Sequence, residues 1–229
     1  LLLASLLALA AALMIFKLGV GPHLPATAKS GRPWAGLAAF RQPRFRAAAL
    51  GYFGHCWELY ALWALVPFLV ARELERLGAS SSAQPWLSFA VIALGLPGCV
   101  LAGKWSRQIG SDRVACVALA TSGALCLVYP LLGSTSPWLL LALLGLWGVS
   151  VIADSAQFSA LASATAPPER LGAALAMMNA IGFGLTIPSI ALVTALWSSQ
   201  SLAVIWWLLP GPILGLIAMR GLNRRPARA

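Results

Sequence analysis

The sequence predicts an all-α fold, a polytopic membrane helical bundle with seven transmembrane helices. Of its 229 residues, 60% are hydrophobic and only 10% are charged, whereas a soluble globular domain has about 25% charged residues. Apolar runs recur along the chain, and each is close to the roughly 20 residues that span a bilayer as a helix. None of them alternates apolar with polar residues, which is the pattern of a membrane β-strand.

Seven apolar runs define the expected helices. A helix is the form expected for each run, because it satisfies its backbone hydrogen bonds internally where lipid offers no partner. The approximate limits are 1–20, 47–70, 86–103, 114–132, 137–161, 172–196 and 202–219.

The basic residues predict the orientation of these helices. Cytoplasmic connectors carry an excess of Lys and Arg, and here the basic residues gather in alternate connectors. On the opposite side, Arg72 and Arg76 stand beside Glu73 and Glu75. The amino end is therefore predicted to lie outside and the carboxyl end in the cytoplasm. The fourteen basic residues on the predicted cytoplasmic side are Lys17, Lys29, Arg32, Arg41, Arg44, Arg46, Lys104, Arg107, Arg113, Arg170, Arg220, Arg224, Arg225 and Arg228.

Composition and motifs also exclude several functions. The net charge of +10 comes from short connectors rather than from one folded basic face, so no nucleic-acid partner is predicted. Without a nucleotide-binding loop or a catalytic constellation, neither an enzyme nor a primary pump is predicted. No cofactor and no metal site is predicted, because the cysteines form no Cys-x-x-Cys pair and have no His at zinc-ligand spacing. We interpret them as buried structural thiols: Cys56, Cys99, Cys116 and Cys126.

Two polar residues interrupt the apolar run 51–66, GYFGHCWELYALWALV. His55 and Glu58 are three residues apart, which places both on one face of a helix. Counted from Ala47, Glu58 lies about 16 Å deep, close to the middle of a hydrocarbon core about 30 Å thick. A buried carboxylate is unfavourable there, so we expect it to line a cavity or to meet a partner. Two interpretations stay open: a site for proton coupling or substrate, and a structural pair that ties this helix to a neighbour.

Asp154 is the other acidic residue inside an apolar run. Counted from Pro137, it lies about 25 Å along its helix, near the predicted cytoplasmic mouth and roughly 12 Å from Glu58 along the membrane normal. That separation argues against an intramembrane enzyme with paired catalytic acids. We expect Asp154 to form an ion pair with Arg107 or Arg113 that latches a cytoplasmic gate, and the alternative is a contact with the substrate.

A small polar face occurs in the run 172–196. Asn179, Gly182 and Thr186 recur at i, i+3 and i+7, a spacing that aligns them on one side of a helix. Two roles fit this face: polar lining of a substrate cavity, with Asn179 as the cavity residue, or close packing between helices.

The connector 103–113 reads GKWSRQIGSDR. It resembles the Gly-x-Leu-Ala-Asp-Arg-x-Gly-Arg-Arg loop of the major facilitator superfamily (MFS), which lies between helices two and three and, in weaker form, between helices eight and nine. Gly103 and Gly110 match the two glycines and Arg113 closes the turn, whereas Arg107 stands where the family has Asp. The runs GYFGHCWELYALW and ADSAQFSAL are also similar to those of bacterial members of the family.

The resemblance implies an MFS-type half with seven transmembrane helices, equivalent to family helices six to twelve. In that alignment 1–20 is the last helix of the amino-terminal half, 21–46 is the central cytoplasmic loop, 47–219 is the six-helix carboxyl-terminal transporter half and 220–229 is a basic cytoplasmic tail. The expected cytoplasmic gate combines the connector with the buried acid: Asp154, Arg107, Arg113, Gly103 and Gly110.

The implied function is secondary active transport of a small solute by alternating access in a bacterial inner (plasma) membrane. We expect proton coupling through Glu58 and His55. The implied partners are a small-molecule substrate, the lipid bilayer and the amino-terminal half of the same transporter, because the chain is interpreted as a fragment without the first five helices. The alternative is a membrane protein without transport activity, either a truncated product or an accessory subunit.

Overall fold

Helices make up all the regular secondary structure among the residues that the structure describes. The computed structural model describes residues 2–18 and 33–222. It divides the chain into two units, Leu1–Arg32 and Pro33–Ala229, which are treated separately. The first unit contains one helix, α1 (Leu2–Leu18), whose 17 residues extend over about 26 Å. The prediction of an all-α fold is therefore confirmed.

The second unit is a bundle of helices. Long α-helices cross it, and short 3₁₀ helices (η) lie between them. Its elements are η1 (Pro33–Arg41), α2 (Pro43–Arg76), η2 (Ser81–Ala83), α3 (Gln84–Ala93), α4 (Gly95–Ile109), α5 (Ser111–Leu131), α6 (Pro137–Ala153), α7 (Ser155–Thr165), η3 (Pro168–Arg170), α8 (Leu171–Gln200), η4 (Ser201–Leu208) and α9 (Pro210–Met219).

Six segments of this unit cross the bundle, in agreement with the six predicted spans between 47 and 219. Within the described residues, five stretches are long and apolar enough to span a membrane, and the last of them, Pro168–Met219, has 52 residues. As one helix it would be about 78 Å long, more than twice the thickness of a hydrocarbon core. The chain instead reverses at Ser201, which has a φ of 48°, and η4 packs back against α8.

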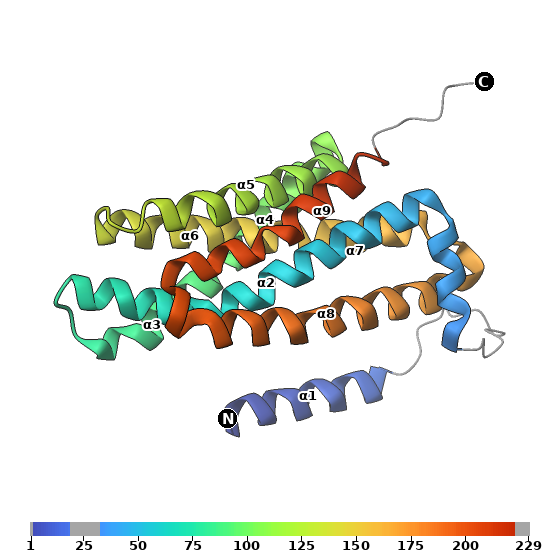
Figure 1. Cartoon of the computed structure of the whole chain (residues 1–229). Coiled ribbons are helices and arrows are strands. Elements are labelled where there is room, and N and C mark those ends of the chain that lie inside the picture. Colours follow the sequence, from blue (N-terminus) through green and yellow to red (C-terminus); the bar gives the residue numbers. More distant parts are fainter. Residues whose placement is uncertain (1, 19–32, 223–229) are drawn as a thin grey trace. The chain divides into compact units, whose positions relative to one another are not determined.

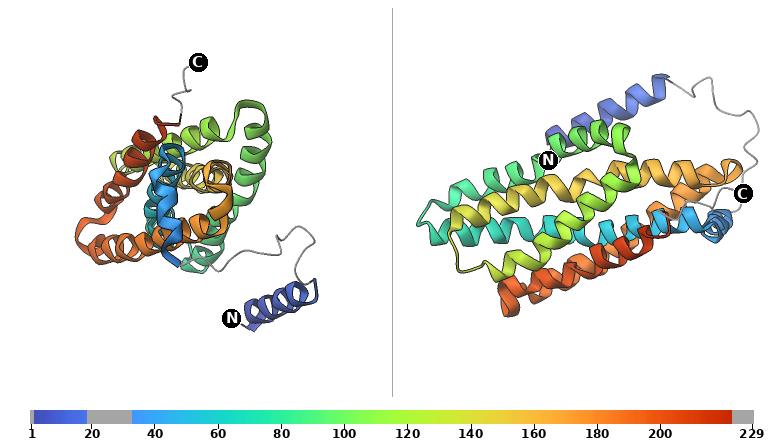
Figure 2. Two further views of the ribbon diagram at one scale, coloured as in Figure 1. Left: turned by 90° about the vertical axis from the view of Figure 1, so that its right-hand side faces the viewer. Right: turned by 90° about the horizontal axis from the view of Figure 1, so that it is seen from above.

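Helix α2 is the centre of the second unit. It packs against α3, α6, α7, α8 and α9, and in Figures 1 and 2 it runs between the other helices along the bundle. Its crossing with α9 is especially close, because a Cβ atom on Gly54 would lie 2.2 Å from the carbonyl oxygen of Gly211. Small residues allow two helix backbones to approach in this way.

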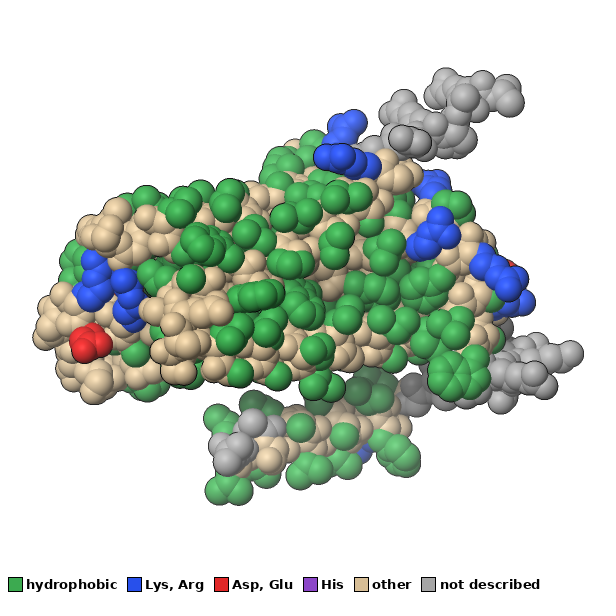
Figure 3. Space-filling model, viewed as in Figure 1, with side chains coloured by type: hydrophobic (Ala, Val, Ile, Leu, Met, Phe, Trp, Pro, Cys, Tyr) green, Lys and Arg blue, Asp and Glu red, His purple; other side chains and the backbone are tan. Residues whose placement is uncertain are grey.

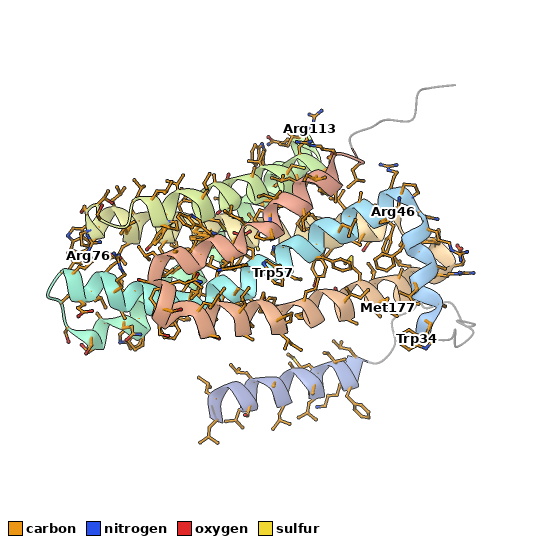
Figure 4. The ribbon with its side chains drawn as sticks, viewed as in Figure 1. Trp34, Arg46, Trp57, Arg76, Arg113 and Met177 are labelled. Carbon is orange, nitrogen blue, oxygen red and sulfur yellow. The ribbon has the colours of Figure 1, made fainter. Side chains whose placement is uncertain are left out.

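The charged side chains lie near the two ends of the bundle, and an apolar surface separates them (Figure 3). One end carries the α5–α6 turn, and the other carries the α4–α5 turn. We call them the α5–α6 end and the α4–α5 end. Figure 4 places Arg76 at the first, and Arg46 and Arg113 toward the second. This distribution is typical of a helical bundle that crosses a bilayer.

The predicted central loop, 21–46, differs from the structure over its second part. Its residues 21–32 lie outside the described residues, but Pro33–Arg41 forms the 3₁₀ helix η1 and α2 already begins at Pro43. Helix η1 packs against α8, where a Cβ on Gly36 would lie 2.1 Å from the carbonyl oxygen of Ala173. The apolar residues of 33–41 explain the difference, since Ala39 is fully buried by this packing.

Candidate functional site

The carboxylate of Glu58 is buried in the middle of the bundle and accepts three hydrogen bonds. The donors are Ser122 Oγ at 2.7 Å, Trp147 Nε1 at 3.0 Å and Cys126 Sγ at 3.4 Å. The Glu58 side chain is 0% exposed. Both carboxylate oxygens therefore have neutral donors, which is the usual way in which a protein holds a charged or polar group out of water.

Two neighbouring helices position these donors. Ser122 and Cys126 are four residues apart on α5, so they share one face of that helix. Trp147 comes from α6, and its ring packs against Tyr129 with centroids 5.9 Å apart. The next residue, Gly148, lets α6 approach α3, since a Cβ there would lie 2.1 Å from the carbonyl oxygen of Val91. The indole therefore lies against Tyr129 of α5 with its N–H on Glu58.

His55 and Asp154 form a second buried pair, one helical turn from Glu58. Their Nδ1 and Oδ1 atoms are 2.8 Å apart, and the side chains are 2% and 1% exposed. The imidazole N–H is not aligned for a linear hydrogen bond, and neither atom has another hydrogen-bond partner among the described residues. The contact is thus close enough for an ion pair. The rings of Tyr52 and Phe158 flank the imidazole, at centroid distances of 6.1 Å and 5.9 Å.

A break in the fourth crossing segment brings Asp154 to this position. Helix α6 ends at Ala153, α7 begins at Ser155, and Asp154 is the residue between them. Helix α2 is continuous here, so His55 and Glu58 project from adjacent turns of one face. We call the resulting group the polar cluster; its members are His55, Glu58, Ser122, Cys126, Trp147 and Asp154.

The polar cluster lies between two apolar cores. On α2, the residues up to Cys56 belong to the core near the α4–α5 end, and those from Leu59 belong to the core near the α5–α6 end. The cluster contains two carboxylates and one imidazole but no Lys or Arg. When the polar cluster binds or releases one proton, its net charge changes by one unit, and no Lys or Arg in the cluster offsets that change. In the described part of the chain, no group of three or more His, Cys, Asp or Glu side chains is arranged to hold a metal ion.

The α4–α5 connection is a turn around a single residue. Helix α4 ends at Ile109, α5 begins at Ser111, and Gly110 between them has a φ of 96°. A residue with a side chain would be strained in that conformation, whereas glycine is not. The backbone conformation of this turn therefore explains why a glycine stands at this position of the motif.

A family model described as Major Facilitator Superfamily matches residues 1–188. The chain belongs to the major facilitator superfamily. It is therefore an integral, multi-pass membrane protein and a membrane transporter. Comparison with curated proteins and with solved structures gave no match.

In this MFS chain the predicted latch between Asp154 and a basic connector is absent. Asp154 contacts His55, while Arg107 and Arg113 are exposed and form no ion pair with a described carboxylate. The depth estimate was wrong because the segment Pro137–Thr165 has 29 residues and is about 43 Å long, more than the core needs. Asp154 is about 16 Å from the end of this segment at Thr165, and His55 is about 18 Å from the start of α2 at Pro43. The two residues therefore lie at the same level of the bundle.

Glu58 was expected to line a cavity or to meet a partner, and in the structure it meets partners. Its side chain is fully buried, and all three of its donors belong to this chain. His55 and Glu58 do not pair with each other; His55 contacts α6–α7, whereas Glu58 contacts α5 and α6. The structure therefore brings Asp154 into the same group and removes the predicted 12 Å separation.

The remaining predicted site residues lie apart from the cluster. Asn179 is exposed on α8, although Gly182 and Thr186 of the same predicted face are buried. Gly182 lies against Tyr52 of α2, where a Cβ would be 2.5 Å from a ring carbon. Gly103 has open space beside it, with no heavy atom within 4 Å of the position that a Cβ would take. The polar face of α8 is thus mainly a packing face.

Sequence reasoning missed Ser122, Cys126 and Trp147 as partners of Glu58. Cys126 was interpreted only as a structural thiol. A signal was present, because Ser122 and Cys126 are four residues apart in an apolar run and so share a face. Their pairing with Glu58 joins residues 64 and 68 positions apart, which periodicity within one helix does not reveal.

Proposed function

We propose that this chain forms the carboxyl-terminal half of a secondary active transporter that moves a small solute by alternating access, and that the polar cluster carries the coupling proton. The observation that supports the proposal is the burial of two carboxylates and one imidazole within one group, each at most 2% exposed. Ionisable residues inside membrane segments are unfavourable and are typical of proton relays and substrate paths.

The charges of the cluster give the coupling its physical basis. Proton loss adds a negative charge to a site surrounded by apolar cores, where charges interact more strongly than in water. The donors to Glu58 come from α5 and α6, and the partner of His55 stands at the α6–α7 break. A change in protonation therefore alters the attraction between α2 and these helices, which is how a proton can bias a two-state carrier. His55 Nδ1 and Asp154 Oδ1 are 2.8 Å apart, so a small rotation of the imidazole would align them for proton transfer.

The bundle supports the proposed topology. Six crossings place both of its ends on one side of the membrane. The α4–α5 end carries Lys104, Arg107 and Arg113, whereas the two arginines at the α5–α6 end stand beside two acids. We therefore assign the α4–α5 end to the cytoplasmic side of a bacterial inner membrane. The amino end of the whole chain, before the first helix, is then outside. The proposed partner of the bundle is an amino-terminal half that completes the solute pathway.

The test is solute-driven proton movement in the full-length carrier, reconstituted in liposomes that contain a pH-sensitive dye. Candidate solutes are screened on the wild-type protein, and the active one is then used with two variants. We expect Glu58→Gln and Asp154→Asn to abolish solute-driven proton movement while the protein still binds the solute. The matched control is Thr121→Ala at the adjacent position of α5, where the hydroxyl bonds only to the Val117 carbonyl oxygen of the same helix; it lies outside the polar cluster and keeps coupling.

Two results would contradict the proposal in different ways. If both carboxylate variants move protons with the solute at the wild-type ratio, the polar cluster is structural and the proton site lies elsewhere. If no solute in the screen is transported by the wild-type protein while it folds and inserts normally, a membrane protein without transport activity becomes the better assignment.

A further inference from the structure

A polar pocket of about 660 Å³ lies at the α5–α6 end, away from the polar cluster. Three turns form its walls: the last turns of α2, the α5–α6 turn and the α8–η4 turn. Its polar side chains are Arg72, Arg76, Ser134, Gln200 and Ser201. The volume falls within the roughly 300–1,000 Å³ that small-molecule sites occupy.

The pocket has a surplus of positive charge. Arg72 and Arg76 both pair with Glu73, whose side chain is 0% exposed, and the Arg76 contact is 2.6 Å long. Two guanidinium groups thus share one carboxylate, which leaves one positive charge without compensation. Glu75 is close in the sequence, but it lines a different hollow at the start of α3 and forms no ion pair with either arginine, so the surplus is local to the pocket.

The two arginines are held in position but remain open on one side. Arg72 also donates to the carbonyl oxygen of Gly133 at 2.8 Å, and Arg76 donates to that of Thr135. Their side chains are still 26% and 28% exposed. Each guanidinium has five N–H donors, so donors remain on both after these contacts. Fixed guanidinium groups lose little entropy when they bind an anion.

Neutral donors complete the lining. Ser134 and Ser201 contribute hydroxyl groups. The Gln200 side-chain oxygen accepts a hydrogen bond from Trp207 Nε1 at 3.0 Å, which leaves its NH₂ group to donate. A lining with excess positive charge, several donors and no carboxylate side chain is suited to an anion with several acceptor oxygens.

We propose that this pocket binds a phosphate group, either as a free phosphate or as the phosphodiester of an anionic lipid. The planar guanidinium fork matches the paired oxygens of phosphate better than it matches a spherical ion such as chloride. The pocket is larger than one phosphate needs, so it has room for an ester substituent. This site is independent of the proton coupling assigned to the polar cluster.

The first experiment measures thermal unfolding of the intact chain in detergent after removal of phospholipid. Inorganic phosphate is titrated against chloride at the same ionic strength and pH. We expect phosphate to raise the Tm in a saturable way, and Arg76→Gln to weaken the apparent affinity about tenfold or more, as for loss of a charge-assisted hydrogen bond. The control is Lys104→Gln, which removes the same charge at the opposite end and leaves the affinity unchanged.

A milder variant protects the test against misfolding. Ser134→Ala leaves the Glu73 ion pairs intact, so its Tm in chloride should equal that of the wild type. Its apparent affinity for phosphate should be a few fold weaker.

The second experiment reconstitutes the chain in nanodiscs with phosphatidylglycerol or phosphatidylcholine and identifies retained lipid by native mass spectrometry. Saturable stabilisation by phosphate identifies the free anion as a ligand, and retention of phosphatidylglycerol that Arg76→Gln abolishes identifies a lipid headgroup.

The proposal is overturned if phosphate and chloride stabilise the wild-type chain equally and phosphatidylglycerol is retained no better than phosphatidylcholine. It is also overturned if Arg76→Gln and Lys104→Gln weaken binding to the same extent, because a general effect of net charge then explains the result.

Discussion

Replacement of Glu58 by alanine or by glutamine separates the packing role of this residue from its charge. Glu58→Gln keeps the shape and an acceptor oxygen, and the Ser122 hydroxyl can turn to accept from the new amide. Glu58→Ala removes the acceptor for Ser122, Trp147 and Cys126. The alanine variant therefore leaves buried donors unpaired, whereas the glutamine variant does not.

The expected loss of stability follows from these contacts. A serine hydroxyl can turn to a carbonyl of its own helix, and a thiol is a weak donor. The buried Trp147 indole N–H has no such substitute, and an unpaired donor of this kind costs about 1–3 kcal/mol. The cavity left by the missing side-chain atoms adds about 1–2 kcal/mol. We expect Glu58→Ala to lose about 2–5 kcal/mol and Glu58→Gln less than about 1 kcal/mol, because Gln also removes the burial of a charge.

The chain carries its own reporters for this measurement. Cys56 and Cys126 are buried, so a thiol-reactive fluorescent probe in detergent reports unfolding as they become accessible. A loss of about 2–5 kcal/mol corresponds to a decrease in Tm of about 4–20 °C for a chain of this size. The matched control is Glu75→Ala on the exposed side of α2, with no expected change. A Glu58→Ala variant that unfolds within about 1 °C of the wild type would refute the reasoning, as would equal losses for Ala and Gln.

Two further predictions concern the contacts of α2. Asp154→Asn and His55→Asn are each expected to lower the stability by about 3–5 kcal/mol, because each leaves a buried partner uncompensated. In a double-mutant cycle measured by Tm, the two effects should fall short of additivity by more than about 1 kcal/mol. Additive effects would show that the two residues are not coupled. Gly54→Ala is expected to lose about 1–3 kcal/mol, since its Cβ would lie 2.2 Å from the Gly211 carbonyl oxygen. Gly184→Ala on α8 is the control, with no heavy atom within 4 Å of its Cβ, and an equal loss there would contradict the packing argument.

The crossing segments of the bundle could be predicted from the sequence because they depend on local properties. The run 47–70 became α2, and the runs 114–132 and 172–196 became α5 and α8 with ends shifted by a few residues. Apolar length and the need to satisfy backbone groups in lipid are both properties of a single segment. Gly110 was placed in the connector by its resemblance to the family loop, and its positive φ is a local requirement that a glycine meets.

The partners of the polar residues were decided only by the tertiary structure. Glu58 was selected correctly as a buried carboxylate, but its three donors are 64, 68 and 89 positions away along the chain. Asp154 was assigned to the wrong group because its segment, Pro137–Thr165, is longer than the hydrocarbon core needs, so a count from one end misplaced its depth. The sequence by itself determined which segments enter the membrane and which side chains are unfavourable there. Only helix packing decided that His55, Glu58 and Asp154 meet, because long-range contacts depend on how neighbouring helices rotate and approach, and apolar periodicity within one helix does not specify that.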